Sequence, residues 1–106
     1  MAITNTLLQN SAAQTIFTSA GSHGDVVSVV YLCNRSATYS TANVFVVQSG
    51  GTANQMLNMI YSNVFIAAGD TLVMDMEKII LATGDSIKAN CTNNNDVVAT
   101  VSTLAV

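Results

Sequence analysis

The sequence contains no proline and no tryptophan, and it has few charged residues. Without proline, its turns must be formed by Gly, Asn and Asp, which tolerate positive φ. Charged residues make up 8% of the 106 positions, whereas about 25% is typical of soluble domains. Ser, Thr and Asn replace them, and such a surface loses its water at lower cost than one covered with ions. The shortage of charge therefore favours a subunit that packs against other proteins over a free monomer.

Basic residues are particularly scarce, since Arg35, Lys78 and Lys88 are the only ones and the net charge is -3. Binding to nucleic acid requires clustered Lys and Arg, so no nucleic-acid partner is expected. Met1 to Gln14 lacks the positive region and continuous apolar core of a signal peptide. No apolar run is long enough to span a bilayer. We therefore expect synthesis in the cytoplasm, without a membrane partner.

The two cysteines, Cys33 and Cys91, both lie inside apolar runs. Free cysteine behaves there as a small buried hydrophobe. Sequence alone does not show whether the two meet. In the absence of a secretion signal, free thiols are favoured over a disulfide.

Apolar runs of strand length alternate with turn residues along the chain. A turn about every eight to twelve residues is typical of sandwiches and barrels. We predict a single all-β domain over residues 1–106: an antiparallel β-sandwich, jelly-roll or Ig-like, of about eight short strands, with an edge strand or arm at 1–9. The expected strand segments are Ile3 to Leu8, Gln14 to Thr18, Val26 to Asn34, Ala42 to Gln48, Met59 to Ile66, Thr71 to Met76, an apolar run within Glu77 to Ala82, Ser86 to Cys91, and Val97 to Leu104.

Two of these segments, Val26 to Asn34 and Ala42 to Gln48, are apolar on both faces and should be central strands. Ile3 to Leu8 is expected at an edge. One helical turn is expected at Asn54 to Asn58. Met74 is expected to fill the core, together with Met76 if the strand runs straight.

A short motif occurs twice in the second half of the chain. Ile66 to Leu72 reads IAAGDTL, and Leu81 to Ile87 reads LATGDSI, fifteen residues later. Each copy predicts a Gly-Asp turn before a strand, with positive φ at Gly69 and Gly84. The Asp carboxylates should accept hydrogen bonds from nearby backbone N–H groups.

The sequence offers little material for catalysis or metal binding. His23 is the only histidine, and a catalytic interpretation would pair it with Asp25 and with Ser22 or Ser28. A solvated loop histidine is the preferred interpretation. A calcium site at Asp70, Asp75, Glu77 and Asp85 lacks a ligand loop of known type, and one His with two distant Cys does not predict zinc. We therefore assign no catalytic, cofactor-binding or metal residue and predict a protein that is not an enzyme.

The second half of the chain, from IAAGDTLVMD at Ile66 to Asp75 through TGDSIKA at Thr83 to Ala89 and VVATVS at Val97 to Ser102, resembles small virion proteins of tailed bacteriophages. The segments IFTS at Ile16 to Ser19, YLCNRS at Tyr31 to Ser36 and VFVVQSGG at Val44 to Gly51 extend the resemblance to the first half. The resemblance implies a β-sandwich structural subunit of a virus particle, with no catalytic residue. It leaves open whether the subunit decorates the head or belongs to the neck, tail or fibre attachment.

The sequence therefore predicts a non-enzymatic virion subunit that packs by uncharged β-surfaces onto copies of itself and other virion proteins. Strand addition at an exposed edge, either Ile3 to Leu8 or Val97 to Leu104, is a further expected contact. The alternative is a carbohydrate- or cell-surface-binding module using the loops Ser19 to Asp25, Arg35 to Ser40 and Thr92 to Asp96. A small hydrolase is the third hypothesis.

Overall fold

A computed structural model describes residues 2–75 and 78–106. Over these residues the chain forms nine β-strands and no helix. The strands are β1 (Ala2–Leu7), β2 (Gln14–Thr18), β3 (Asp25–Asn34), β4 (Ser40–Val47), β5 (Met59–Ile66), β6 (Thr71–Met74), β7 (Ile79–Leu81), β8 (Ser86–Cys91) and β9 (Val97–Ala105). The all-β prediction is confirmed, with nine strands in place of about eight.

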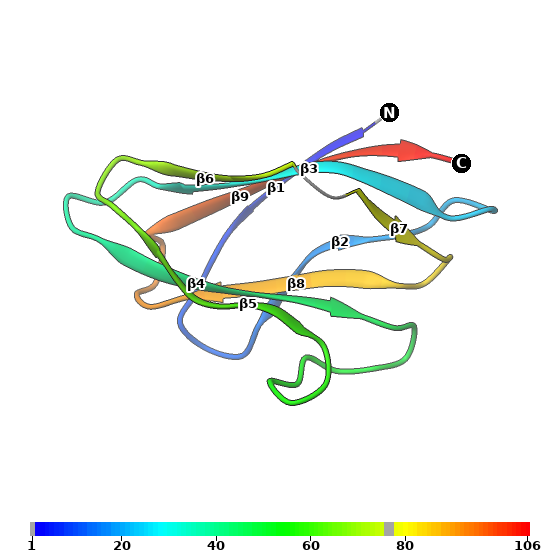
Figure 1. Cartoon of the computed structure of the whole chain (residues 1–106), viewed down its shortest axis with the longest axis horizontal. Helices are drawn as coiled ribbons and strands as arrows, with labels where there is room; N and C mark the ends of the chain where they lie inside the picture. The colour runs from blue at the N-terminus through cyan, green and yellow to red at the C-terminus, as the bar shows by residue number, and fades with distance from the viewer. Residues whose placement is uncertain (1, 76–77) are drawn as a thin grey trace.

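The strands form two packed antiparallel sheets (Figure 1). Sheet A has the order β1-β9-β3-β6, with β7 paired to the other end of β3, and sheet B has the order β2-β8-β4-β5. The pairing is nested, because β1 pairs with β9, β2 with β8, β3 with β6 and β7, and β4 with β5. This is the strand order of a jelly roll. Of the two sandwich types that the sequence left open, jelly-roll and Ig-like, the chain therefore has the first.

The core lies between the sheets and is built by alternation along each strand. In β9, Val97, Ala99 and Val101 are fully buried, whereas the residues between them are partly exposed. Ile87 and Ala89 of β8 supply the facing layer from sheet B. The central positions predicted for β3 and β4 are confirmed, since each has a neighbouring strand on both sides.

Both Gly-Asp motifs form the predicted turns. The N–H of Asp70 donates to the carbonyl of Ala67 at 3.0 Å, and that of Asp85 donates to the carbonyl of Ala82, also at 3.0 Å. The glycine at the third position has φ +72° at Gly69 and +93° at Gly84, the geometry of a type II turn. The carboxylates accept backbone N–H bonds as expected, Asp70 from Thr71 and Asp85 from Ala82.

One predicted edge is wrong. Val97 to Leu104 lies in β9, which is paired with β1 on one side and with β3 on the other. Its backbone groups are therefore committed to sheet A and do not form an open edge. Ile3 to Leu8 was placed correctly, because β1 is the last strand of its sheet.

Local details follow the prediction with small differences. Asn54 to Asn58 forms a single turn, in which the N–H of Asn58 donates to the carbonyl of Asn54 at 3.0 Å. The strand expected at Thr71 to Met76 is described as β6 up to Met74, which packs against the core. The positions of Met76 and Glu77 lie outside the described residues.

Candidate assembly surface

The outer face of sheet A, turned away from sheet B, carries no charged side chain on its described strands. The alternation of side chains along each strand and the register between strands agree on which residues lie on this face. The set is Ile3, Asn5 and Leu7 of β1; Val98, Thr100, Ser102 and Leu104 of β9; Val26, Val29, Tyr31 and Cys33 of β3; Thr71 and Val73 of β6; and Ile80 of β7. We call this set the sheet A outer face.

Apolar side chains on this face stand beside one another across the strands. Tyr31, in the middle of β3, is paired with Val73 on one side and Thr100 on the other. At the end of the sheet that holds both chain termini (Figure 1), Val26 is paired with Leu104 and with Ile80. Ile80 is 77% exposed and Leu104 is 53% exposed. The apolar residues therefore gather on β3 and its neighbours and are not a scatter of single residues, whereas Asn5, Thr100 and Ser102 make part of β1 and β9 polar but uncharged.

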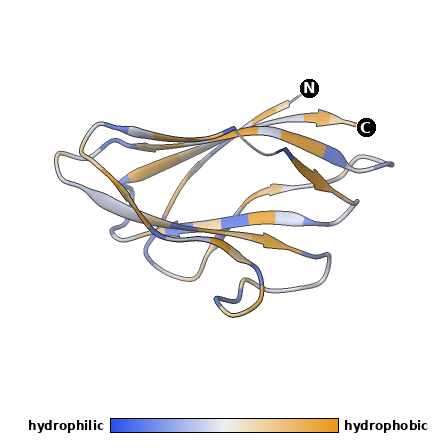
Figure 2. Ribbon diagram, viewed as in Figure 1, coloured by the Kyte–Doolittle hydropathy of each residue, from blue (hydrophilic) through white to orange (hydrophobic). Residues whose placement is uncertain are grey.

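The outer face of sheet B has a different character. Its strand β8 presents Lys88 and Asn90, and the middle of β8 is marked by hydrophilic colour in Figure 2. The amide of Asn43 donates to Asn90 at 2.9 Å and accepts from the backbone N–H of Asn63 at 2.8 Å. Phe45 on this face is only 5% exposed, and the loop between β4 and β5 lines a hollow beside it through Thr52, Ala53 and Gln55. Sheet B thus covers Phe45, but it leaves Phe65, opposite Thr41 at the β5 edge, 62% exposed.

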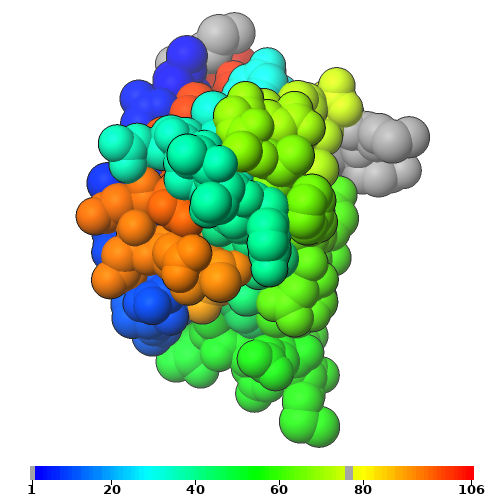
Figure 3. Space-filling view, turned by 90° about the vertical axis from the view of Figure 1, so that its left-hand side faces the viewer, coloured from blue at the N-terminus to red at the C-terminus, as the bar shows by residue number. Residues whose placement is uncertain are grey.

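The three loops proposed for a carbohydrate site do not form one site. Arg35 to Ser40 and Thr92 to Asp96 lie side by side at one end of the sandwich (Figure 3), where the N–H of Arg35 donates to the carbonyl of Asp96 at 2.8 Å. Ser19 to Asp25 lies at the other end, separated by the length of β3, which is roughly 30 Å for ten residues. At the first end Tyr39 stacks on Phe65 with ring centroids 5.1 Å apart, and both rings are exposed.

The residues named for a catalytic triad are used by the fold. Asp25 is buried, and its carboxylate accepts a 2.6 Å hydrogen bond from the hydroxyl of Ser19. The hydroxyl of Ser28 donates to the carbonyl of Ser102 at 3.0 Å. His23 and Ser22 are exposed in the loop. Among the described residues, no hydrogen bond joins His23 to Asp25, Ser22 or Ser28, and the Ser19 hydroxyl that bonds Asp25 is buried.

The acidic residues are also dispersed. Asp70 and Asp85 belong to turns that follow β5 and β7, at opposite ends of the sandwich. Asp75 follows β6, and Glu77 lies outside the described residues. Over residues 2–75 and 78–106, no group of three acidic, His or Cys side chains is placed to hold a metal ion.

Cys33 and Cys91 are both free thiols, as the sequence favoured. Cys33 is half-buried on the sheet A outer face. Cys91 is buried in sheet B, and burial raises the pKa of its thiol above the ordinary value. A raised pKa reduces the thiolate fraction at neutral pH, so Cys91 lacks the character of a reactive cysteine.

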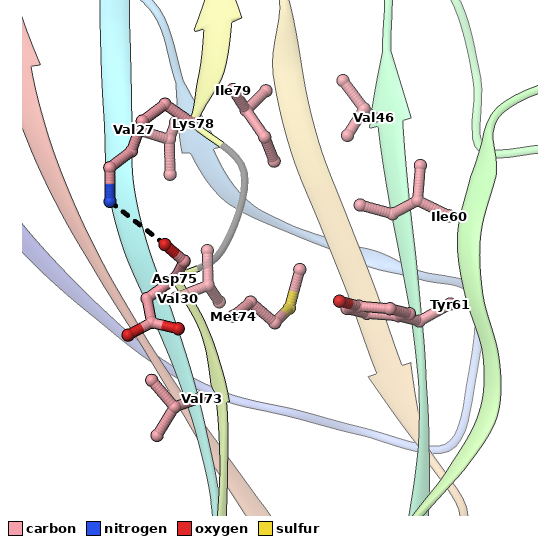
Figure 4. Close-up of a pocket in the computed structure, with 10 residues that line it drawn as sticks. All are labelled: Val27, Val30, Val46, Ile60, Tyr61, Val73, Met74, Asp75, Lys78 and Ile79. Carbon is pink, nitrogen blue, oxygen red and sulfur yellow. Dashed lines mark hydrogen bonds between the residues drawn. The ribbon is translucent and has the colours of Figure 1, made fainter.

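A cleft of about 580 Å³ opens between the two sheets beside β5 and β6 (Figure 4). Val30 and Met74 line it from sheet A, and Val46 and Tyr61 line it from sheet B. Lys78 stands at its margin, where its ammonium donates to the carbonyl of Asp75 at 3.2 Å and to that of Ser28 at 2.9 Å. The described lining is otherwise apolar, and its two charged residues, Asp75 and Lys78, meet through the backbone carbonyl of Asp75.

The described part of the chain has no helix of the length and hydrophobicity needed to cross a membrane. Comparison with protein-family models, with curated proteins and with solved structures found no match to this chain. Of the two described outer faces, that of sheet A is the one without a charged side chain, since Lys88 lies on that of sheet B.

Proposed function

We propose that this chain is a non-enzymatic structural subunit of a tailed-phage virion, which packs by its sheet A outer face against neighbouring subunits. The observation that carries the proposal is the absence of any charge among the outward residues of that sheet, where most side chains are apolar. The resemblance to small phage virion proteins supports the choice of particle. Its place would be on the head surface, or at the neck, tail or fibre attachment.

Burial of an uncharged sheet face supplies a clear driving force. Four strands at a spacing of about 4.8 Å and about eight residues in length cover roughly 500 Å² per copy. If about two thirds of that area is apolar, two packed copies remove about 700 Å² from water, worth about 17 kcal/mol at 25 cal/mol per Å². Loss of translational and rotational freedom costs about 4–15 kcal/mol. A single contact is thus favourable by a modest margin, and repetition over a particle multiplies it.

The partners that this surface suits are other copies of the chain and other virion proteins with uncharged faces. A partner rich in phosphate is disfavoured, because the chain has only three basic residues. The same scarcity of charge supports location in an assembled particle such as the virion.

Purified particles of the phage that encodes the chain provide the test. We expect mass spectrometry to find the chain in the particle in many copies, and cryo-electron microscopy to place the sheet A outer face against a neighbour. Tyr31→Glu puts a charge in the centre of that face. A chain with this substitution should be lost from the particle. Thr15→Glu is the matched control, because Thr15 lies on the outside of sheet B opposite Lys88. Absence of the chain from the particle, or full occupancy with Tyr31→Glu, would refute the proposal.

A carbohydrate-binding role remains the second candidate, and one observation favours it. The exposed Tyr39–Phe65 stack lies at the end of the sandwich that carries the Arg35 to Ser40 and Thr92 to Asp96 loops. Aromatic faces and amide side chains suit sugar rings and hydroxyls. Binding of the isolated chain to a glycan array, abolished by Tyr39→Ala and retained with Tyr31→Glu, would favour this role over the structural one.

A further inference from the structure

We propose that β1 of one copy pairs with β1 of a second copy, antiparallel and about a twofold axis at Asn5, so that the two A sheets become one. The inference names a second contact, made by an edge and not by the sheet A outer face. It does not depend on the virion assignment, because it concerns two copies in solution.

The edges of the two sheets differ in how well they are protected against pairing. In sheet B, β2 has a register shift between Thr15 and Phe17, and β5 has a bulge at which Asn63 takes φ +50°. The far side of sheet A is divided between β6, with four residues, and β7, with three. Bulges and short strands are the common means of blocking an edge. Each of these three edges therefore resists an added strand.

The edge formed by β1 has none of these features. Its six residues keep an unbroken register with β9, from Ala2 opposite Thr103 to Leu7 opposite Val98. Its sequence, AITNTL, has neither a charged residue nor a proline. Lys or Pro on an edge strand is the usual deterrent to pairing. Among residues 2–75 and 78–106, no strand pairs with the outer side of β1.

The direction of the free backbone groups follows from the contacts at the two ends of β1. The N–H of Leu8, just beyond the strand, donates to the carbonyl of Val97 at 2.9 Å. The carbonyl of Ala2 accepts from the hydroxyl of Thr103 in the same strand β9. Even-numbered residues thus direct their backbone groups at β9. Because the direction alternates along a strand, the N–H and C=O groups of Ile3, Asn5 and Leu7 point to the open edge.

These three residues determine the register of the pair. An antiparallel partner can exchange both hydrogen bonds only between residues that point outward on each strand. Full use of Ile3, Asn5 and Leu7 requires Asn5 opposite the partner's Asn5 and Ile3 opposite the partner's Leu7. The twofold axis then passes beside Asn5, which makes the contact isologous. The carbonyl of Leu7 must release one long bond, since Gln9 Nε2 donates to it at 3.5 Å.

Side chains support the same register. Ile3, Asn5 and Leu7 all lie on the sheet A outer face, so Ile3 of each copy would stand beside the partner's Leu7. Ile3 is 68% exposed and Leu7 is 42% exposed in the single chain. Asn5 Oδ1 accepts from the hydroxyl of Thr100 at 2.9 Å, so the Asn5 side chain is already bonded within its own copy. The pairing would therefore join two apolar faces into one of twice the width.

Substitution of proline for Asn5 tests the β1–β1 contact without harming the fold. The N–H of Asn5 points away from β9, so Asn5→Pro removes no backbone hydrogen bond inside the chain, and proline is tolerated at such edge positions. The side-chain bond from Thr100 to Asn5 Oδ1 is lost with any replacement of the Asn5 amide. Asn5→Thr keeps the N–H and serves as the control. With Tyr31→Glu added to every variant to remove the face contact, we expect the chain with Asn5 and the chain with Asn5→Thr to form dimers by sedimentation equilibrium. Asn5→Pro should lose the dimer while keeping its melting temperature within a few degrees.

Disulfide trapping tests the register in a chain with Cys33→Ser and Cys91→Ala. Opposed residues of a hydrogen-bonded antiparallel pair have Cα atoms about 5.5 Å apart, within the range of a disulfide. Asn5→Cys should therefore yield a covalent dimer under mild oxidation. Thr100→Cys, on the same face but one strand inward, should not, because two copies of it would be about 14 Å apart.

The two contacts can fail separately. Trapping through Asn5→Cys should persist when Tyr31→Glu is added, because the charge affects the face and not the edge. If Asn5→Pro with Tyr31→Glu self-associates as the chain with Asn5 and Tyr31→Glu does, or if Asn5→Cys gives no more covalent dimer than Thr100→Cys, the edge contact is refuted while the proposed face contact stands. A wild type that remains monomeric up to millimolar concentration refutes it as well.

Discussion

Substitution of alanine for glycine at the two Gly-Asp turns tests the fold at a matched pair of sites. Gly69 and Gly84 occupy the same turn position and both have positive φ. Their surroundings differ. A Cβ at Gly69 would meet no atom within 4 Å, whereas a Cβ at Gly84 would lie 2.6 Å from Ser49 Oγ and 3.0 Å from Ser49 Cβ. Backbone strain should therefore act at both sites and steric conflict at only one.

The expected magnitudes follow from these distances. A residue with a Cβ in the left-handed region costs about 1–2 kcal/mol, and this is the whole expected loss for Gly69→Ala. Gly84→Ala adds an overpacking cost of about 1–3 kcal/mol. Rotation of Ser49 can move its Oγ but not its Cβ, and the N–H of Ser49 is held by Asp85 at 2.9 Å. Gly84→Ala should therefore lose about 2–5 kcal/mol.

Urea denaturation at one fixed protein concentration measures both losses, because self-association makes apparent stability concentration-dependent. Replacing Ser49 by glycine removes both conflicting atoms. In that background Gly84→Ala should cost no more than Gly69→Ala does. Equal costs at the two sites in the wild-type background, or a loss at Gly84 that Ser49→Gly leaves unchanged, would refute the steric argument. Neutral behaviour of both variants would refute the turn geometry itself.

Two further predictions concern buried polar groups. Asn34 is fully buried, and its amide donates to the carbonyls of Thr38 at 2.8 Å and Ile66 at 2.9 Å. Asn34→Leu should lower the free energy of unfolding by about 2–4 kcal/mol in urea, since it removes these two bonds and those that Asn34 Oδ1 accepts from Ser36. With a thiol reagent at pH 8, Cys33 should react first and Cys91 only at the rate of local or global opening, because burial raises the pKa of the Cys91 thiol. Simultaneous reaction of both thiols in the folded chain would contradict the burial of Cys91.

Most strand positions were predictable because their signals are local. Ser86 to Cys91 alternates without a break, and the structure has β8 over the same residues. Met59 to Ile66 alternates imperfectly, and the structure supplies the reason. Its register shifts where Asn63 is bulged and held by the side chain of Asn43. That partner is twenty residues away, so the irregular pattern could be seen in the sequence but not explained.

Sheet order was less predictable, because it depends on contacts distant in sequence. The side chains of Val97 to Leu104 alternate with a period of two, and this pattern is the same for an edge strand and for a central one. The pattern therefore could not show that this strand is central. The apolar character of β3 on both sides was correctly taken as a sign of a central strand. A central position means that the backbone of β3 pairs with a strand on each side. It gives no reason for the apolar side chains of Val29 and Tyr31 on the outward face. Only the two-sheet arrangement shows that this face is bare.

The mass of the protein in solution, measured by light scattering over a range of concentrations, tests the central claim most directly. The wild type and Thr15→Glu should form assemblies whose average mass rises with concentration. Tyr31→Glu should lower that mass sharply at every concentration, while its circular dichroism remains that of the folded sandwich. A wild type that keeps the mass of one chain throughout, or a Tyr31→Glu variant that associates as the wild type does, would contradict an assembly role for the sheet A outer face.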